Sequence, residues 1–521
     1  MKVYGLIQTV FPFISKTEAQ DFRLQLYNSF KKRNDLTFEL IDALSSQTNP
    51  SSGIGLSLSS LFTRKHSSIS QLVSQVLEKE KLETIINNYS SALYKNFISG
   101  DPSSSKVMFL AADETSIFKQ DSNSMEDRGY VHGKTKGISP IGIGHSYSYL
   151  VIINEDLPQW VIPFDSKRVK TNESGPLTGI AQFKNFMQLH PENEISVFTA
   201  DSKYSSFACI EEMYSLGVKA LLLSRLNSTR TLYLPFTGEQ KSKGAVKKYG
   251  DEFKLHDAQT WPKPDYTDDD FKITLQNGKV HQVKLQRWND LIIKGKKNRP
   301  MYNKPFDIVN VIVTHNGEPV YHRNMWLIIS GEKRKNINCR QAYLQYKRRF
   351  NIEHFFRFSK QELLLGKYQC PNTNTADVWG QISMLSYLNL LTGASLVNSN
   401  VLSPWEKHKP IADISTPYQT KRSFLSIVDT LGTPAVPCEY KEHGQGRKLG
   451  TILPIKAKQD IVKKAKKPKS KLKLINKDTN TTTEKSSKVS ESKKIIFDSV
   501  DDIKVKLKLS DEQILLLKNV A

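Results

Sequence analysis

The sequence predicts an α/β protein in which helices flank a sheet, with a helical region before it, a β-rich insertion within it and a basic tail after it. Two apolar runs of strand length end in aspartates, at residues 107–113 and 195–201. The segment 338–365 lacks Pro and Gly and is rich in Gln, Leu, Lys, Arg and Glu, which favours a long helix. Between residues 225 and 319, short charged segments alternate with turn sequences, which favours hairpins.

Residues 1–100 are expected to be helical. Ser15 and Glu18 have the spacing of a capping box, in which each side chain bonds the backbone N–H of the other residue. The apolar residues that follow recur at steps of four and predict one buried helix face. They are Phe22, Leu26 and Phe30. The Pro- and Ser-containing stretch 100–105 predicts a linker, so the core begins just after it.

The core is expected to alternate strands and helices. After the strand that ends in Asp113, the pattern predicts the order strand, strand, helix, strand, helix, strand. The segments are 146–153, 160–164, 177–189, 195–201, 207–214 and 218–224. Asp113 and Asp201 thus stand at the carboxyl ends of two strands, where open α/β sheets place their sites. A single strand-end Asp is more commonly a turn former or a helix N-cap.

The predicted helix over 338–365 carries Tyr346, Arg349, Glu353 and Lys360 in the spacing Y-x2-R-x3-E-x6-K. At about 100° per residue these four fall within one stripe about 60° wide. Such a stripe is ordinarily the solvated face of a helix. A helical glutamate that joins two strand-end aspartates, however, gives a set of oxygen ligands able to hold two divalent cations about 3.5 to 4 Å apart.

Together these residues resemble the DDE transposases of bacterial insertion sequences, in particular the IS-four-like superfamily with the Y-R-E-K signature. The resemblance covers about residues 106–398, with D-x-T at Asp113–Thr115, D-x-x-Y at Asp201–Tyr204 and the complete Y-R-E-K spacing. It implies an RNase H-like catalytic core. It also implies a cut-and-paste DNA transposase that cleaves element ends and transfers the strands into target DNA.

The resemblance implies a role for each carboxylate. Asp113, Asp201 and Glu353 would be the catalytic residues and the ligands of two Mg²⁺ or Mn²⁺ ions. One ion would activate water or a 3′-hydroxyl, and the other would stabilise the leaving oxygen of an in-line displacement at phosphorus.

The other signature residues would contact DNA phosphates. Arg349 would hold a phosphate in a fork, Tyr346 would donate a hydroxyl bond, and Lys360 would reach a phosphate farther along the strand. Trp288 is the candidate for stacking on an extruded base. The alternative for Trp288 is a place in the core of the insertion itself.

These patterns divide the chain into regions, two of which have alternative roles. The N-terminal region is either a DNA-binding domain that holds element ends or a plain helical cap on the catalytic core. The basic tail either contacts phosphate nonspecifically or only keeps the chain soluble. The expected divisions are 1–100 helical, 106–227 first part of the core, 228–319 β-rich insertion, 320–398 second part of the core with the signature helix, 399–450 irregular, and 451–521 basic tail.

Composition points to a polyanionic partner. Lys and Arg outnumber Asp and Glu by 75 to 52, for a net charge of +23, of which +9 belongs to residues 451–521 and +14 to residues 1–450. The expected partner is double-stranded DNA, as transposon ends and target, bound by a homodimer. The four cysteines have no zinc spacing, and neither a signal peptide nor a membrane span is expected, which favours a cytoplasmic protein. The resemblance implies that this cytoplasm is bacterial and that the protein is nucleoid-associated.

Two rival functions remain. His354 and Arg357 match the H-x-x-R of tyrosine recombinases, with Tyr387 as the nucleophile, and that chemistry needs no divalent metal. The other rival is a catalytically inactive, domesticated descendant that binds DNA through its positive surface. Activity in EDTA would identify the recombinase, and binding without cleavage in Mg²⁺ or Mn²⁺ would identify the descendant.

Overall fold

The computed structural model describes residues 14–98, 107–133, 141–240, 242–275, 278–295, 299–397, 414–439, 450 and 457–463. The chain divides into two units, Met1–Lys464 and Ala465–Ala521, and every described residue belongs to the first. The predicted linker falls within residues 99–106, which lie outside the described residues. Of the predicted tail, only residues 457–463 are described.

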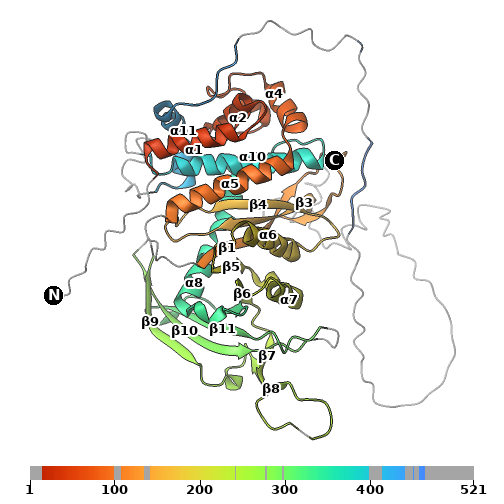
Figure 1. The fold of residues 1–521 in the computed structure, drawn as a ribbon, viewed down its shortest axis with the longest axis vertical. Helices are drawn as coiled ribbons and strands as arrows, with labels where there is room; N and C mark the ends of the chain where they lie inside the picture. Colours follow the sequence, from red (N-terminus) through yellow and green to blue (C-terminus); the bar gives the residue numbers. More distant parts are fainter. Residues whose placement is uncertain are drawn as a thin grey trace, which may run out of the picture. The chain divides into compact units, whose positions relative to one another are not determined.

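A large mixed sheet forms the centre of the fold (Figure 1). Its strand order is β2-β3-β1-β5-β6-β13-β11-β10-β9, with β4 paired to β3 and β12 to β11. Parallel pairs join β1 to β5 and β5 to β6, and the other pairs are antiparallel. The strands are β1 (Val107–Phe118), β2 (Gly129–His132), β3 (Ile141–Ile152), β4 (Ile162–Val169), β5 (Ile195–Ala200), β6 (Ala220–Leu226), β9 (Tyr266–Thr274), β10 (Val280–Leu291), β11 (Phe306–His315), β12 (Glu318–Pro319) and β13 (Met325–Ser330).

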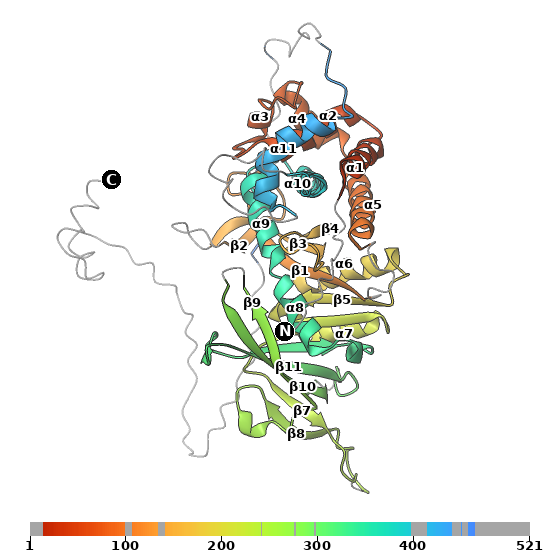
Figure 2. The ribbon, with the colours of Figure 1, turned by 90° about the vertical axis from the view of Figure 1, so that its left-hand side faces the viewer.

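Helices cover both faces of this sheet (Figure 2). Successive side chains of a strand point to opposite faces, and β3 shows which helix lies on which face. Ser148 of β3 bonds Gln182 of α6 (Gly175–Leu189), whereas the ring of Tyr149 packs against Phe355 of α9 (Asn351–Glu362). Helix α6 and helix α9 therefore lie on opposite faces of the sheet.

The order of elements in the first part of the core agrees with the sequence prediction. The chain runs β1, β3, β4, α6, β5, α7 (Phe207–Ser215) and β6. Two differences concern the edge beside β1. An additional short strand, β2, pairs with β3, and β1 continues past Asp113 to Phe118 because it stays paired with β3 as far as the Phe118 and Gly144 partners. Asp113 therefore lies inside a strand and not at its end.

The N-terminal helices pack onto the rest of the fold. Ser15 and Glu18 form the predicted capping box of the first helix. Helices α2 and α5 contact α10 (Thr373–Thr392), and α5 also contacts β4. Buried Arg23 bonds both Asp42 in α2 and Asn389 in α10. The helices are α1 (Lys16–Ser29), α2 (Asn34–Ser46), α3 (Gly53–Leu56), α4 (His66–Gln71), the short π-helix η1 (Leu72–Val76) and α5 (Lys79–Ile98).

The segment between β6 and β13 is rich in strands and largely continues the main sheet. Strands β9, β10 and β11 extend it beyond β13, while β7 (Thr231–Pro235) and β8 (Tyr249–Lys254) form a separate two-stranded sheet. An Asn316-Gly317 turn joins β11 to β12, and both residues have positive φ, 52° and 87°, as a two-residue hairpin turn requires.

Two predictions about helices are corrected. The segment 338–365 is not one helix, because α8 (Cys339–Arg348) ends and α9 begins on either side of Arg349 and Phe350. The region 399–450 is not wholly irregular, because Thr416 and Gln419 form a capping box and Pro417 opens α11 (Pro417–Leu431). Among the described helices, none is both long and apolar enough to cross a membrane.

Candidate active site

Asp113 and Asp201 lie at matching positions on neighbouring parallel strands. The last β1–β5 pair is Ala111 with Thr199, and two residues later stand Asp113, within β1, and Asp201, just after β5. Asp201 follows β5 directly and N-caps a 3₁₀ turn, η2 (Ser202–Ser205), accepting a bond from the Lys203 backbone N–H at 2.9 Å. Paired strands lie about 4.8 Å apart, so the two aspartates are close at one edge.

The break between α8 and α9 places Arg349 between two acidic residues. Its Nη1 lies 3.2 Å from Oδ2 of Asp113, and its Nη2 lies 3.5 Å from Oε1 of Glu353. The backbone N–H of Ile352 and of Glu353 each bond the carbonyl three residues earlier, which tightens the chain as α9 begins. One guanidinium therefore connects the strand aspartate with the helical glutamate.

The electrostatics of Asp113 link all three carboxylates. Burial raises the pKa of Asp113, and the nearby charge of Arg349 lowers it. The backbone N–H of Glu114 donates to its Oδ1 at 2.8 Å and lowers the pKa further, while the carboxylates of Asp201 and Glu353 raise it. The three acidic groups therefore share one field, in which like charges oppose one another.

Tyr346 and Arg225 adjoin this group. Tyr346 is buried, and the guanidinium carbon of Arg349 lies 5.5 Å from its ring centroid. Burial raises the pKa of Tyr346, Arg349 and Arg225 lower it, and Asp201 raises it. Nε of Arg349 is buried and has no hydrogen-bond partner within the described part of the chain, so this guanidinium keeps a free donor.

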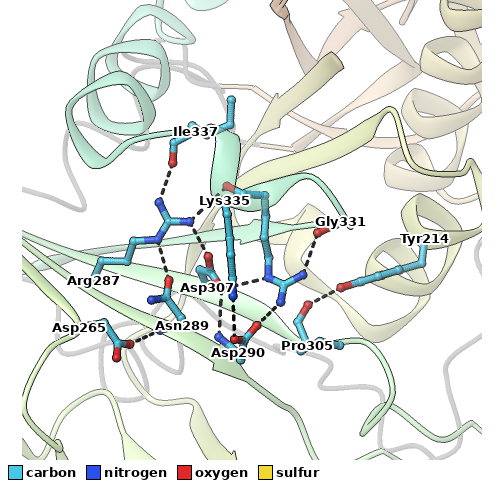
Figure 3. Close-up of polar contacts among 11 residues, drawn as sticks. Tyr214, Asp265, Arg287, Asn289, Asp290, Pro305, Asp307, Gly331, Lys335 and Ile337 are labelled. Atoms are coloured by element: carbon cyan, nitrogen blue, oxygen red, sulfur yellow. Dashed lines mark hydrogen bonds and ion pairs between the residues drawn. The ribbon is translucent and has the colours of Figure 1, made fainter. Parts of the chain in front are cut away.

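A buried ionic network fixes the start of α8 (Figure 3). Asp307 of β11 is fully buried and pairs with both Arg287 of β10 and Arg334, which precedes α8. Nη1 of Arg287 donates to the carbonyl of Ile337 at 2.6 Å, and Asn338 then caps α8. The insertion strands are thereby tied to the helix that carries Tyr346.

Lys360 stands apart from the other signature residues. It lies seven residues beyond Glu353, about 10 Å of helix rise, and no described residue bonds or pairs with its ammonium group. It is half-buried, and burial lowers its pKa to about 8. The structure therefore does not bring Lys360 into contact with the carboxylates.

The structure places Trp288 inside the insertion. It is 3 % exposed, packs against Phe253, Trp261 and Trp326, and donates its indole N–H to the carbonyl of Pro262. A buried ring has no free face for an extruded base, so the stacking role predicted for Trp288 is wrong and its alternative, a core residue, applies.

The tyrosine-recombinase alternative also fails on geometry. Tyr387 of α10 is 1 % exposed, and its ring packs against Trp160, Phe355 and Phe358. Burial raises the pKa of its hydroxyl above the ordinary range. A nucleophile must reach a DNA phosphate, and this hydroxyl does not.

The site residues suit a hard divalent cation in chemistry but are not arranged as a finished metal site. Within the described ranges, no three His, Cys, Asp or Glu side chains stand close enough together to hold a metal ion. Three carboxylates that act on one another nevertheless supply the oxygen ligands that Mg²⁺ prefers. The one cation between Asp113 and Glu353 is the guanidinium of Arg349.

Sequence analysis missed two basic residues near these carboxylates. Arg225 is the second-last residue of β6 and Arg323 precedes β13. Both line a pocket that Ser202, the residue after Asp201, also lines. Neither belongs to a motif. Only the pairing of β6 with β13 brings them together, and spacing along the chain gives no sign of that pairing.

Neighbouring strands that present acidic side chains at one edge of an α/β sheet are typical of metal-dependent enzymes that act on phosphodiesters. The chain belongs to the DDE superfamily endonuclease family, whose model matches residues 25–288. The matched range contains Asp113 and Asp201 but ends before the helix with Glu353.

Two further comparisons give less. No curated protein matches the sequence closely enough to count as a relative. One similar solved structure is a cryo-EM structure of the piggyBac transposase synaptic complex with hairpin DNA, with 12 % identity and a TM-score of 0.35 over 82 % of this chain and 81 % of that chain. At that TM-score, no residue or role is carried over from it.

Proposed function

We propose that this endonuclease-family chain is a DNA transposase of the cut-and-paste type, which cleaves element ends and joins them to target DNA. In this proposal the core is RNase H-like, and the Y-R-E-K spacing of Tyr346, Arg349, Glu353 and Lys360 supports a relation to the insertion-sequence enzymes. The observation that carries the proposal is that three carboxylates from distant parts of the sequence lie around the guanidinium of Arg349. Asp113 and Asp201 each stand two residues beyond the last β1–β5 pair, Ala111 with Thr199, and Arg349 connects Asp113 to Glu353.

In this proposal the carboxylates of Asp113, Asp201 and Glu353 hold two Mg²⁺ or Mn²⁺ ions. The bound ions would supply the charge that activates the attacking oxygen and stabilises the leaving oxygen of a phosphodiester. Glu353 completes the set by a small movement of its side chain, which is 43 % exposed and stands in the first turn of α9.

Arg349, Tyr346 and Lys360, from α8, α9 and the turn between them, position the DNA in this proposal. The guanidinium of Arg349 has an unused Nε donor and exchanges its carboxylate partners for a phosphate when DNA arrives. The hydroxyl of Tyr346 donates a hydrogen bond to the DNA backbone beside it. Lys360 contacts a phosphate a few nucleotides away, consistent with its distance along α9.

The N-terminal helices act as a cap on the core, consistent with their packing on α10 and β4. Two chains would bring two element ends together, so the active form in complex with DNA is a homodimer. We expect the protein to act in the bacterial cytoplasm, where it can reach DNA directly.

A second candidate is the inactive descendant that only binds DNA. It is favoured by one observation, namely that no described group of three ligands is arranged for a metal. In that case Arg349 would remain paired with the acidic residues permanently, and the positive surface alone would act.

A metal-titrated nicking assay separates the two candidates. The substrate is duplex DNA that carries the sequences flanking the gene, and Mg²⁺ or Mn²⁺ is varied with EDTA as control. Strand cleavage that needs the metal supports the transposase. Tight binding without cleavage at every metal concentration contradicts it and supports the descendant.

A further inference from the structure

A small polar pocket opens beside the carboxylates, at the ends of β5 and β6 (both labelled in Figure 1). Its volume is about 240 Å³, below the roughly 300–1,000 Å³ of typical small-molecule pockets. Its polar lining residues are Ser202, Arg225, Asn227, Ser228, Arg323 and Asn324. The size suits one anionic group better than a nucleotide cofactor.

Strand pairing builds this pocket. Leu226 of β6 is paired with Trp326 of β13, so the residues that follow β6 lie beside those that precede β13. The side-chain hydroxyl of Ser224 donates to the carbonyl of Asp201 at 2.6 Å and ties the end of β6 to the end of β5. The pocket therefore shares the sheet edge at which Asp113 and Asp201 stand.

The chemistry of the lining is that of a phosphate site. Two arginines bring two positive charges, and serine and asparagine side chains bring further donors. No acidic side chain lines the pocket in the described part of the chain. Paired arginines in that part of the fold, such as Arg287 and Arg334, have carboxylate partners. In contrast, neither Arg225 nor Arg323 has a hydrogen-bond or ion-pair partner for its guanidinium among the described residues.

We propose that this pocket binds a backbone phosphate of the DNA strand next to the phosphate that is cut, with Arg225 and Arg323 as its ligands. The inference rests on the proposed function, since it takes Asp113, Asp201 and Glu353 as the place of cutting. Successive phosphates of one strand are about 3.4 Å apart along the helix axis, so a strand held at the carboxylates carries a neighbouring phosphate past Ser202. The contact positions the strand and reads no base.

The first test measures DNA affinity against salt concentration in EDTA, with the full chain and a duplex of the flanking sequence. The Arg225→Ala/Arg323→Ala variant should lower the slope of log K against log salt by about 1 to 2, because each phosphate contact contributes about 0.9. The Arg225→Lys/Arg323→Lys variant keeps the charges and should retain most of the slope. The Lys31→Ala/Lys184→Ala variant removes two charges from exposed positions, one between α1 and α2 and one on α6, and should leave the slope unchanged.

A slope in the Ala variant equal to that of the wild type refutes the pocket. Circular dichroism keeps the result interpretable, because both arginines are exposed and the variant should stay folded. The salt assay contains no metal, so it tests the pocket separately from cleavage, which the nicking assay tests. If the wild type cuts DNA but the arginine substitutions leave the salt slope unchanged, only the pocket is refuted. If the substitutions lower the slope but the wild type never cuts DNA, only the transposase is refuted.

The second test identifies the phosphate. Single uncharged methylphosphonates are placed at each position around the mapped cut. One neighbouring position should weaken wild-type binding about as much as the double Ala substitution does, and should add nothing in that variant. If every effective position lies away from the cut strand, or none depends on the arginines, the assignment is wrong.

Discussion

Two clusters of aspartate and arginine in this fold show opposite charge balance. In the insertion, Asp307 is fully buried between Arg287 and Arg334, and Asp290 pairs with Arg334 and Lys335. Around Asp113, Asp201 and Glu353, Arg349 is the one arginine of the described residues that pairs with the acidic side chains, and it pairs with two of them.

The difference shows which cluster holds the fold and which awaits a ligand. Burying a charge is favourable only when partners compensate it, and the insertion cluster is fully compensated. The carboxylates of Asp113, Asp201 and Glu353 face a deficit of positive charge, which is why Asp201 and Glu353 raise the pKa of Asp113. A cation and DNA phosphates together would restore the balance.

The strongest way to break this comparison is to remove one carboxylate from the uncompensated cluster. Asp113→Asn, Asp201→Asn or Glu353→Gln should each lower metal-dependent cleavage by at least about 1,000-fold, because several kcal/mol of charge stabilisation are lost. DNA binding in EDTA should persist, and thermal stability should hold or rise because a repulsion is relieved. Nicking assays and thermal melts measure the two effects.

Glu114→Gln is the matched control for these substitutions. Glu114 is the next residue of β1 and lies on the opposite face, near Gly175 at the start of α6. It should cleave as the wild type does. Retained cleavage in any one variant of the three carboxylates would remove that residue from the site.

The compensated cluster should respond in the opposite way. Asp307→Ala leaves Arg287 and Arg334 buried without their shared partner and should cost about 3 to 5 kcal/mol of unfolding free energy. Chemical denaturation measures this loss. Asp269→Ala, which breaks the exposed Asp269–Lys284 pair of the same insertion, should cost at most about 1 kcal/mol. A mild effect at Asp307 would mean that the two clusters do not differ as proposed.

Sequence patterns predicted the elements of the core better than their joints. The apolar runs indicated β1, β5 and α6 because burial dictates their periodicity, and Asp201 does end its strand. The extension of β1 past Asp113 was not predicted, because it depends on pairing with β3, which lies farther along the sequence. The same limit hid the Asp307 network and the Arg225 pocket, which strands far apart in sequence create.

The break at Arg349 is a further lesson of this kind. The residues 338–365 are good helix formers, so propensity alone favours one helix. Instead, α8 packs on β13 and α9 packs on β1, so different strands hold the two helices. A 3₁₀-type turn joins them. Tyr346 and Glu353 nevertheless both adjoin Arg349, on either side of the break.

Metal addition should have an effect of intermediate size, and it tests whether the cluster of Asp113, Asp201 and Glu353 binds a cation. If Mn²⁺ binds the uncompensated cluster, a concentration of ten times its Kd should stabilise the fold by about 1.4 kcal/mol. Differential scanning fluorimetry with and without EDTA measures the shift. The Asp113→Asn variant should lose it and Asp269→Ala should keep it. An equal shift in both variants would place the metal elsewhere.

The smallest expected effect concerns Lys360, a half-buried cation with no ion-pair partner among the described residues. Burial lowers its pKa to about 8 from 10.5, so the unfolded chain binds more protons between those two values. Unfolding free energy should therefore rise with pH from about 8 to 10.5, while below pH 8 the burial cost is fully present. Lys360→Met should flatten this rise and weaken DNA binding at pH 7 by about one phosphate contact in the salt slope. Denaturation at several pH values and salt-dependent binding measure both, and an unchanged pH profile in the variant would show that Lys360 is not the group that titrates.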